Sequence, residues 1–136
     1  MEELKKMGSD NRIIFKSYKK DIIDDISRVD AVVLPSSKGE GLPRIIIEAM
    51  ALGKIVIVSD VPPHSEILGN ELREFIFTVG DEARLKEIIE RLINSKETLS
   101  EKAKFIREKA VRLFDVRKNT KDTEAIYEEY TFNKAS

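Results

Sequence analysis

Apolar and polar positions follow two different periods along the chain, and the change of period divides it into two parts. In the first 80 residues, short continuous apolar runs alternate with segments of helical spacing. From Asp81 onward the apolar positions recur at helical spacing alone. Continuous apolar runs are typical of strands covered on both faces, as in a parallel sheet. The pattern predicts one α/β domain: a Rossmann-like parallel sheet of about four strands with flanking helices over residues 1–80, and a helical C-terminal tail over residues 81–136.

Each predicted strand comes from one short apolar run, and the proline pair Pro62-Pro63 ends the third strand because proline cannot donate to a ladder. The predicted strands are residues 12–16, 31–34, 54–59 and 74–79.

The predicted helices have recognisable start and stop signals. Pro43 lies near the first turn of one helix, where its missing N–H costs little, and Gly53 follows its last turn. Thr98 followed by Glu101 fits a capping box for a tail helix. The predicted helices are residues 1–8, 19–29, 43–52, 64–69, a segment with an apolar stripe at 85–93, another with a stripe at 103–113, and 118–130.

Composition excludes several functional classes. The chain has 136 residues, about one domain, and 24 basic against 25 acidic residues give no global attraction to nucleic acid or to a membrane surface. The absence of cysteine excludes disulfides, thiolate metal sites and cysteine nucleophiles. No apolar run is long enough to span a membrane, and the first residues lack the apolar region of a secretory signal. We therefore expect a cytoplasmic protein, and the 36% of charged residues, mostly Lys and Glu, are typical of a thermophile.

Two carboxylates, Glu40 and Glu48, lie eight positions apart between the second and third predicted strands. The glycines beside Glu40 let the backbone approach a ligand closely. The helix that begins near Pro43 offers unpaired N–H groups and a positive dipole end, which suit pyrophosphate. A carboxylate such as that of Glu48 suits the vicinal hydroxyls of ribose. Together these features indicate a phosphate- and sugar-binding corner, although spacing alone favours a solvated helix residue at Glu48.

Three further residues are candidates for lining the same pocket. His64, the single histidine, follows the third predicted strand and could touch a donor sugar or phosphate, or be an ordinary loop residue. Ser36 and Ser37 follow the second predicted strand and could face the same ligand. One histidine without cysteine gives no convincing Ser-His-Asp triad and no zinc site, so we expect no metal.

The stretch from Glu40 to Asp60 resembles the donor-binding signature of the group 1 retaining glycosyltransferases of the GT-B fold. The shared features are a Glu, seven residues, a second Glu, then Ala-Met-Ala and a strand that ends near Ser or Asp. The segments 30–36 and 66–68 match in order and spacing, and the resemblance covers roughly residues 10–130. It implies the C-terminal, donor-binding domain of such an enzyme.

The resemblance also implies a role for each position of the corner. Glu40 would lie beside the transferred sugar at the reacting centre, as the catalytic residue, and Glu48 would bind the ribose of a nucleotide-diphosphate sugar. Backbone N–H groups between them would hold sugar hydroxyls and the distal phosphate, and because proline has no N–H its neighbours would supply these donors. No metal or other cofactor is implied. The residues of this turn are Gly41, Leu42, Pro43 and Arg44.

The sequence departs from the family at its start, which implies an N-terminally truncated domain. The family's donor domain opens with two further strands and a Gly-Arg…Lys-Gly element whose cations stabilise the leaving diphosphate, and an acceptor domain precedes it. Loss of such charge stabilisation costs orders of magnitude in rate, so we do not expect this chain alone to transfer sugar. Two alternatives stay open: a non-catalytic nucleotide-sugar-binding subunit, and a structural α/β interaction module.

The two missing strands also affect the expected sheet. In the family they separate residues 12–16 from residues 31–34. Without them, these two segments either pair directly across a right-handed crossover or leave an apolar edge. An exposed apolar edge invites another chain. We therefore expect a four-stranded sheet, and either a homodimer or a partner chain that carries the missing half.

Overall fold

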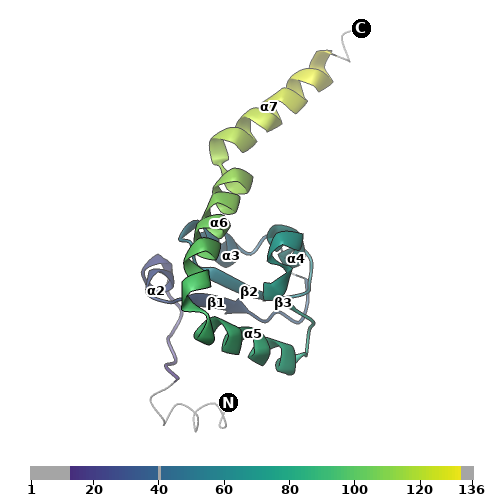
Figure 1. Cartoon of the computed structure of the whole chain (residues 1–136). Coiled ribbons are helices and arrows are strands. Elements are labelled where there is room, and N and C mark those ends of the chain that lie inside the picture. Colours follow the sequence, from purple (N-terminus) through teal and green to yellow (C-terminus); the bar gives the residue numbers. More distant parts are fainter. Residues whose placement is uncertain (1–12, 40, 133–136) are drawn as a thin grey trace.

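The protein has an α/β fold in which helices cover both faces of a parallel sheet, and a helical tail follows (Figure 1). The structure is a computed structural model that describes residues 13–39 and 41–132, without the side chains of residues 96–98, 131 and 132. The α/β class and the helical tail predicted from the sequence are confirmed.

The sheet of the described residues has three parallel strands in the order β1-β2-β3. Val32 of β1 lies opposite Val56 of β2, and Ser59 of β2 lies opposite Phe77 of β3. All five residues of the middle strand are buried, because strands pair with both its edges and helices cover both its faces. The strands are β1 (Ala31–Leu34), β2 (Ile55–Ser59) and β3 (Ile76–Phe77).

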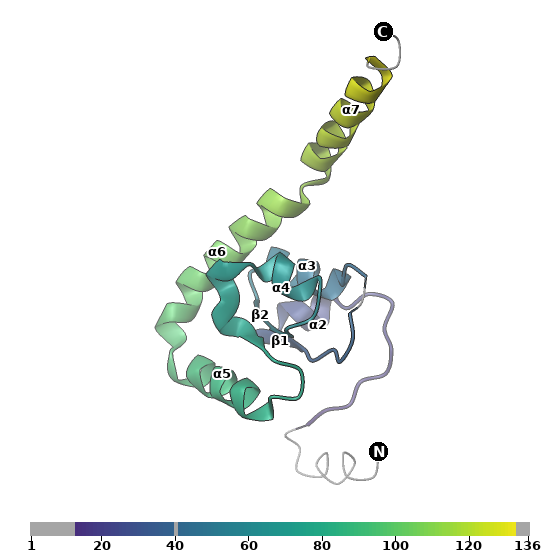
Figure 2. The ribbon, with the colours of Figure 1, turned by 90° about the vertical axis from the view of Figure 1, so that its right-hand side faces the viewer.

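Helices lie in two layers around this sheet. In Figure 1, α3 and α4 lie above the strands and α5 lies below them. The helix α6 packs along α3 and β2, and then leads into α7, which projects away from the body (Figure 2). The helices are α2 (Ile23–Ser27), α3 (Arg44–Ala51), α4 (His64–Leu68), the 3₁₀ helix η1 (Asn70–Phe75), α5 (Glu82–Asn94), α6 (Lys96–Phe114) and α7 (Val116–Phe132).

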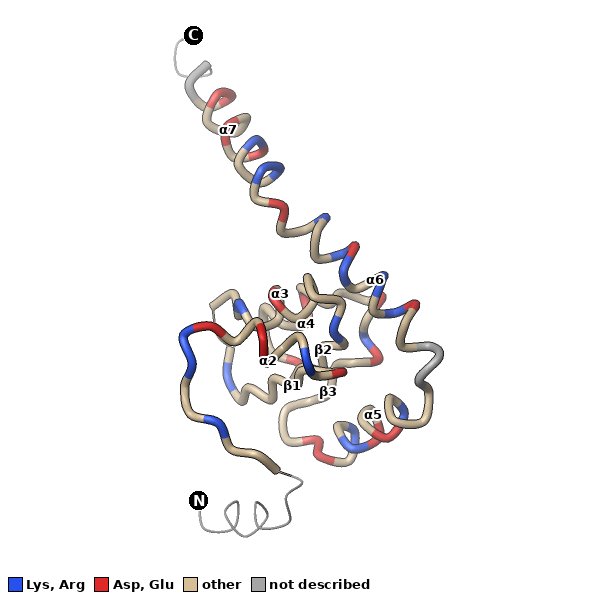
Figure 3. Tube along the Cα trace, turned by 90° about the vertical axis from the view of Figure 1, so that its left-hand side faces the viewer, with Lys and Arg blue, Asp and Glu red and all other residues tan. Residues whose placement is uncertain are grey.

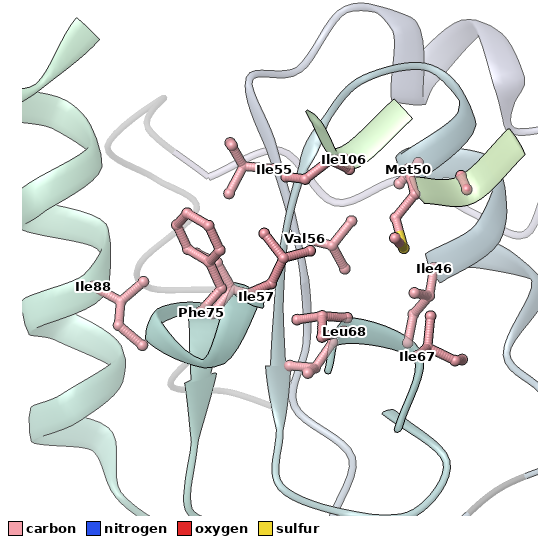
Figure 4. Packing of buried hydrophobic residues seen from close by; sticks show 14 of the residues in the cluster. Ile46, Met50, Ile55, Val56, Ile57, Ile67, Leu68, Phe75, Ile88 and Ile106 are labelled. Carbon is pink, nitrogen blue, oxygen red and sulfur yellow. The ribbon is translucent and has the colours of Figure 1, made fainter. Parts of the chain in front are cut away.

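One hydrophobic core joins both layers to the middle strand (Figure 4). Helical spacing places Ile46 and Met50 on one face of α3, toward Val56 of β2. Ile88 of α5 and Ile106 of α6 are buried in the same cluster. Full burial of one such side chain contributes about 1.5–3 kcal/mol relative to exposure, so this core is what fixes α3 against the sheet.

The prediction of a first strand over residues 12–16 is wrong for residues 13–16, which the structure describes. Residues 13–16 form no strand, and the side chains of Ile14 and Phe15 are exposed; Arg12 lies outside the described residues. Lys16 and Lys19 both donate to the carboxylate of Asp25 in α2, which holds the segment at that helix. These two ammonium groups, Lys16 first, lower the pKa of Asp25 to about 2. Within the described part of the chain the sheet therefore has three strands instead of the four expected.

Element boundaries differ from the prediction in three further places. The helix expected over 19–29 is reduced to α2, and of its apolar stripe only Ile26 is fully buried. The strand expected over 74–79 is shortened because residues 70–75 form η1. The helix α6 begins at Lys96, so Thr98 lies in its first turn and does not take the cap position. The helix expected over 1–8 lies outside the described residues.

The predicted stop of α3 is confirmed. Gly53 has φ +67°, a backbone conformation that other residues rarely adopt, and its N–H bonds the carbonyl of Met50 at 2.9 Å. The chain then turns directly into β2.

An ionic cluster ties the connection before β3 to the two helices that follow. The carboxylate of Glu74 in η1 accepts from Arg91 of α5 at 3.0 Å and from Lys102 of α6. The hydrogen bond from Lys102, and then that from Arg91, lower the pKa of Glu74 below its ordinary value of 4.5. Acidic and basic residues alternate along these helices (Figure 3), but this carboxylate bridges two of them at once.

We predict that Glu74→Gln lowers the free energy of unfolding at pH 7 by about 1 kcal/mol, because both cations lose a charged acceptor. The folded-state pKa of Glu74 lies below its unfolded value, so its contribution is complete above about pH 4.5 and is lost as the pH falls below that value. Urea unfolding at pH 7 and at pH 3 should therefore show a smaller difference between wild type and variant at pH 3 than at pH 7.

The matched control is Glu90→Gln, which removes an exposed carboxylate 3.7 Å from Lys86 on α5. It should change the free energy of unfolding by a few tenths of a kcal/mol at most. An equal loss for Glu74→Gln at both pH values would contradict the ionic explanation.

Candidate functional site: the connection between β1 and α3

The predicted corner lies at the carboxyl edge of the sheet. The strand β1 ends at Leu34, and residues 35–43 lead across this edge to α3. Open α/β sheets bind their ligands outside the carboxyl ends of the strands. We call residues 35–39 and 41–43 the donor loop, after the donor-binding role that the sequence resemblance implies for them.

The end of the donor loop leaves the first turn of α3 open to a ligand. Pro43 is buried in an extended conformation at the N-cap position, and no side chain caps the helix. The first N–H groups of a helix have no partner within it, and together with the helix dipole they favour an anion. Gly41 is exposed, and a Cβ added there would meet no atom within 4 Å. Leu42 before Pro43 is exposed too.

One turn into α3, Glu48 presents a partly accessible carboxylate. Arg44 Nη2 donates to Glu48 Oε1 at 3.0 Å, and the side chains are 88% and 24% exposed, respectively. An exposed pair of this spacing on a helix contributes about 0.3–0.5 kcal/mol. A ligand hydroxyl can therefore replace the guanidinium at little cost. Glu40, the implied catalytic residue, lies outside the described residues, and its role stays a prediction.

The two serines of the donor loop differ in their surroundings. Ser37 is exposed, whereas Ser36 is half-buried and its carbonyl oxygen accepts from the hydroxyl of Ser59 at 2.7 Å. Ser59 was not a predicted site residue. A signal for it was present, because a hydroxyl at the end of an otherwise apolar buried strand has to find an acceptor.

His64 lies inside the protein. It begins α4, its side chain is 0% exposed, and neither ring nitrogen has a hydrogen-bond partner among the described residues. Its backbone N–H bonds the carbonyl of Val61 at 2.8 Å, which fixes the turn after β2. Contact between His64 and a donor stays a prediction, and it would require the ring to become accessible.

A polar cavity of about 750 Å³ lies at the carboxyl ends of β2 and β3. Asp60, Arg73 and Arg84 contribute charged groups to its wall, and none of the predicted site residues that the structure describes lines it. This cavity was not predicted from the sequence, because the residues of its wall, between positions 60 and 84, share no motif. It lies on the β3 side of the edge, away from β1.

From the sequence we expect neither a metal site nor a membrane span. Within residues 13–39 and 41–132 no group of three or more His, Asp or Glu side chains could hold a metal ion. In the same part of the chain no helix is both long enough and apolar enough to cross a bilayer. The expected independence from a metal or other cofactor stays a prediction.

We predict that His64→Leu keeps the free energy of unfolding or raises it by about 1 kcal/mol. Leucine is close to histidine in size, and it removes two buried nitrogens that the described residues leave without a partner. Thermal and urea unfolding should be compared with Leu68→Ala, a core truncation in the same helix that should lose about 2–5 kcal/mol. A loss of more than 1 kcal/mol in His64→Leu would mean that the imidazole makes a stabilising polar contact.

The arrangement agrees with comparisons of the whole sequence. The sequence profile described as "Glycosyl transferases group 1" matches residues 1–111. The chain is 27% identical over 128 residues to "UDP-Gal:alpha-D-GlcNAc-diphosphoundecaprenol alpha-1,3-galactosyltransferase" of Escherichia coli, covering 94% of this chain and 33% of that protein. It is 30% identical over 112 residues to "Putative glycosyltransferase EpsD" of Bacillus subtilis (strain 168), covering 82% of this chain and 29% of that protein.

The chain thus spans about a third of the length of the curated relatives it matches. The profile match covers the donor loop, α3 and all three strands, and it confirms the resemblance stated from the sequence. This chain belongs to the group 1 glycosyltransferase family.

Proposed function

We propose that this chain is the nucleotide-sugar-binding part of a retaining glycosyltransferase, which transfers a sugar from a nucleotide-diphosphate sugar to an acceptor. The observation that carries the proposal is the open first turn of α3 beside the carboxylate of Glu48, at the carboxyl edge of a sheet in a group 1 family member. The Escherichia coli relative is named for UDP-Gal, so uridine nucleotides are the first donors to test.

In the proposed complex each group of the corner has a distinct task. The N–H groups of Leu42 and Arg44 donate to sugar hydroxyls and to the distal phosphate, and the carboxylate of Glu48 accepts from two ribose hydroxyls. Glu40 lies beside the transferred sugar. In the reaction the bond from the anomeric carbon to the diphosphate oxygen breaks, a bond to the acceptor oxygen forms on the same face of the ring, and the proton of the acceptor hydroxyl passes to the departing diphosphate. No metal takes part in this scheme.

We assign binding to this chain and turnover to a larger assembly. The relatives are about three times as long as the stretch that matches this chain. In this proposal the acceptor is held by a part of the assembly that corresponds to the unmatched length of the relatives. A non-catalytic binding subunit and a structural α/β module are the alternatives. A cytoplasmic location and a thermophilic source belong to the same proposal and rest on composition alone.

We predict that UDP, GDP or ADP, or one of their sugars, raises the melting temperature, because a ligand that binds only the folded state stabilises it by RT ln(1 + [L]/Kd). At a hundred times Kd this amounts to about 2.7 kcal/mol. Glu48→Gln should abolish the shift without lowering the melting temperature of the free protein by more than about 2 °C. Differential scanning fluorimetry with millimolar ligands measures both.

The matched control is Glu90→Gln, which breaks an ion pair of the same i,i+4 spacing on α5 and should leave the shift intact. If no nucleotide shifts the wild type, the structural-module alternative is favoured. Sugar transfer by the isolated chain would contradict the assignment of turnover to a larger assembly.

The open edge of the sheet supports an interaction with another chain. Among the described residues β1 pairs only with β2, and an apolar groove of about 640 Å³ runs beside it. We propose that this edge forms a homodimer or accepts a partner chain that carries the remaining length of the relatives, since an unpaired apolar edge is a template for pairing. Residues of the groove include Ala31, Val33, Ile55, Ile57, Ile89 and Ile93.

We predict a dimer in multi-angle light scattering at micromolar concentration, and a shift to monomer in Ile93→Lys. Ile93 is a groove residue of α5 that is 65% exposed, so the charge should block association without unfolding the protein. Ile126→Lys, at a site on α7 that is 64% exposed, is the control and should remain dimeric. A single monomer species at all concentrations would rule out the homodimer.

A further inference from the structure

The inference rests on the proposed function and concerns how the donor loop is held in place. Pairing between β1 and β2 ends at Leu34, which lies opposite Val58. The next residue of β2 is Ser59, whose side chain is 1% exposed. Its hydroxyl donates to the carbonyl oxygen of Ser36 at 2.7 Å, and the carbonyl oxygen of Leu34 lies 3.5 Å away. A side-chain hydrogen bond thus continues the ladder into the first residues of the donor loop.

A second contact holds the donor loop three residues later. A Cβ added to Gly39 would lie 3.1 Å from the carbonyl oxygen of Pro62, so the two backbones touch at this point. A side chain at this position would require the loop or the Pro62 carbonyl to move by a few tenths of an ångström. Both anchors, Ser59 and Pro62, belong to the segment that ends β2. This segment is fixed by the core and by the bond from Asp60 N–H to the carbonyl of Phe77 at 2.8 Å.

We propose that Ser59 is a positioning residue for the donor, with the contact of Pro62 to Gly39 as the second anchor. Residues 37–39 are exposed and contribute little packing of their own, so the position of the loop depends on these contacts. The turn that begins at Gly41, two residues after Gly39, carries the N–H groups that are proposed to bind a nucleotide diphosphate. Binding geometry tolerates displacements of less than about 1 Å before affinity or rate falls steeply. Ser59 touches no substrate in this proposal and acts through the backbone of Ser36.

The decisive variant is Ser59→Ala, studied by hydrogen–deuterium exchange of the full chain. Amides in peptides covering residues 35–44 should exchange about fivefold faster, which corresponds to about 1 kcal/mol for one buried hydrogen bond. Peptides around Ile106 in α6 should keep their wild-type rates, since the core is unchanged. Ser59→Thr retains the hydroxyl and should restore the wild-type exchange rate. Gly39→Ala should accelerate exchange in the same peptides, because its Cβ pushes the loop from Pro62.

Affinity for UDP and for UDP-galactose, measured by titration calorimetry, supplies the functional readout. Kd should rise about tenfold in Ser59→Ala and stay within twofold of wild type in Ser59→Thr. The matched control is Ser27→Ala, which removes a hydroxyl that donates to the carbonyl of Asp24 at 2.7 Å on α2. It should change neither loop exchange nor affinity.

The outcomes separate this inference from the proposed function. Unchanged exchange in residues 35–44, or an equal acceleration throughout the chain, would show that Ser59 has only a general structural role. Faster loop exchange with unaltered affinity would also overturn the inference. A wild type that binds neither UDP nor UDP-galactose would instead count against the proposed uridine donor, while the exchange data would still decide whether Ser59 holds the loop.

Discussion

Complete burial of β2 is the constraint on which the rest of this protein depends. Alternate side chains of β2 face α3 on one side of the sheet and α5 on the other. The strand therefore has no polar position until Ser59. The same burial makes its carboxyl end the best fixed point of the sheet edge. A ligand corner built on exposed loop residues needs such a point, because an exposed loop has little packing to define its position.

The elements nearest this strand were predictable, and those farthest from it were not. The helix α3 has a continuous apolar face and is bounded by Pro43 and Gly53, so local and tertiary preferences agree. Residues 13–16 have strand propensity as well, but they do not pair with the open edge of β1. Ion pairs to Asp25 from Lys16, and from Lys19 just beyond this segment, supply a competing local partner that no period in the sequence reveals.

The candidate site shows the same division. Glu48 could be named from the sequence because the motif around it has a fixed spacing, and the structure places it on the first turns of a helix at the carboxyl edge. The proposed role of Ser59 depends on the register between β1 and β2, which places its hydroxyl within hydrogen-bonding distance of the carbonyl of Ser36. The register is set by how two strands pair, and it cannot be predicted from the spacing of residues along the sequence.

The ion pair between Arg44 and Glu48 fits a carboxylate that has to change partners. An unpaired, half-buried carboxylate would destabilise the free protein, whereas a strongly held one would resist a ligand. The pair seen here contributes about 0.3–0.5 kcal/mol, while a hydrogen bond to a charged group contributes about 1.5–3 kcal/mol. In the proposed complex, two ribose hydroxyls would therefore outweigh the guanidinium. The exchange would leave Arg44 exposed to solvent as before, so the free and the proposed ligand-bound states of α3 need no difference in backbone structure.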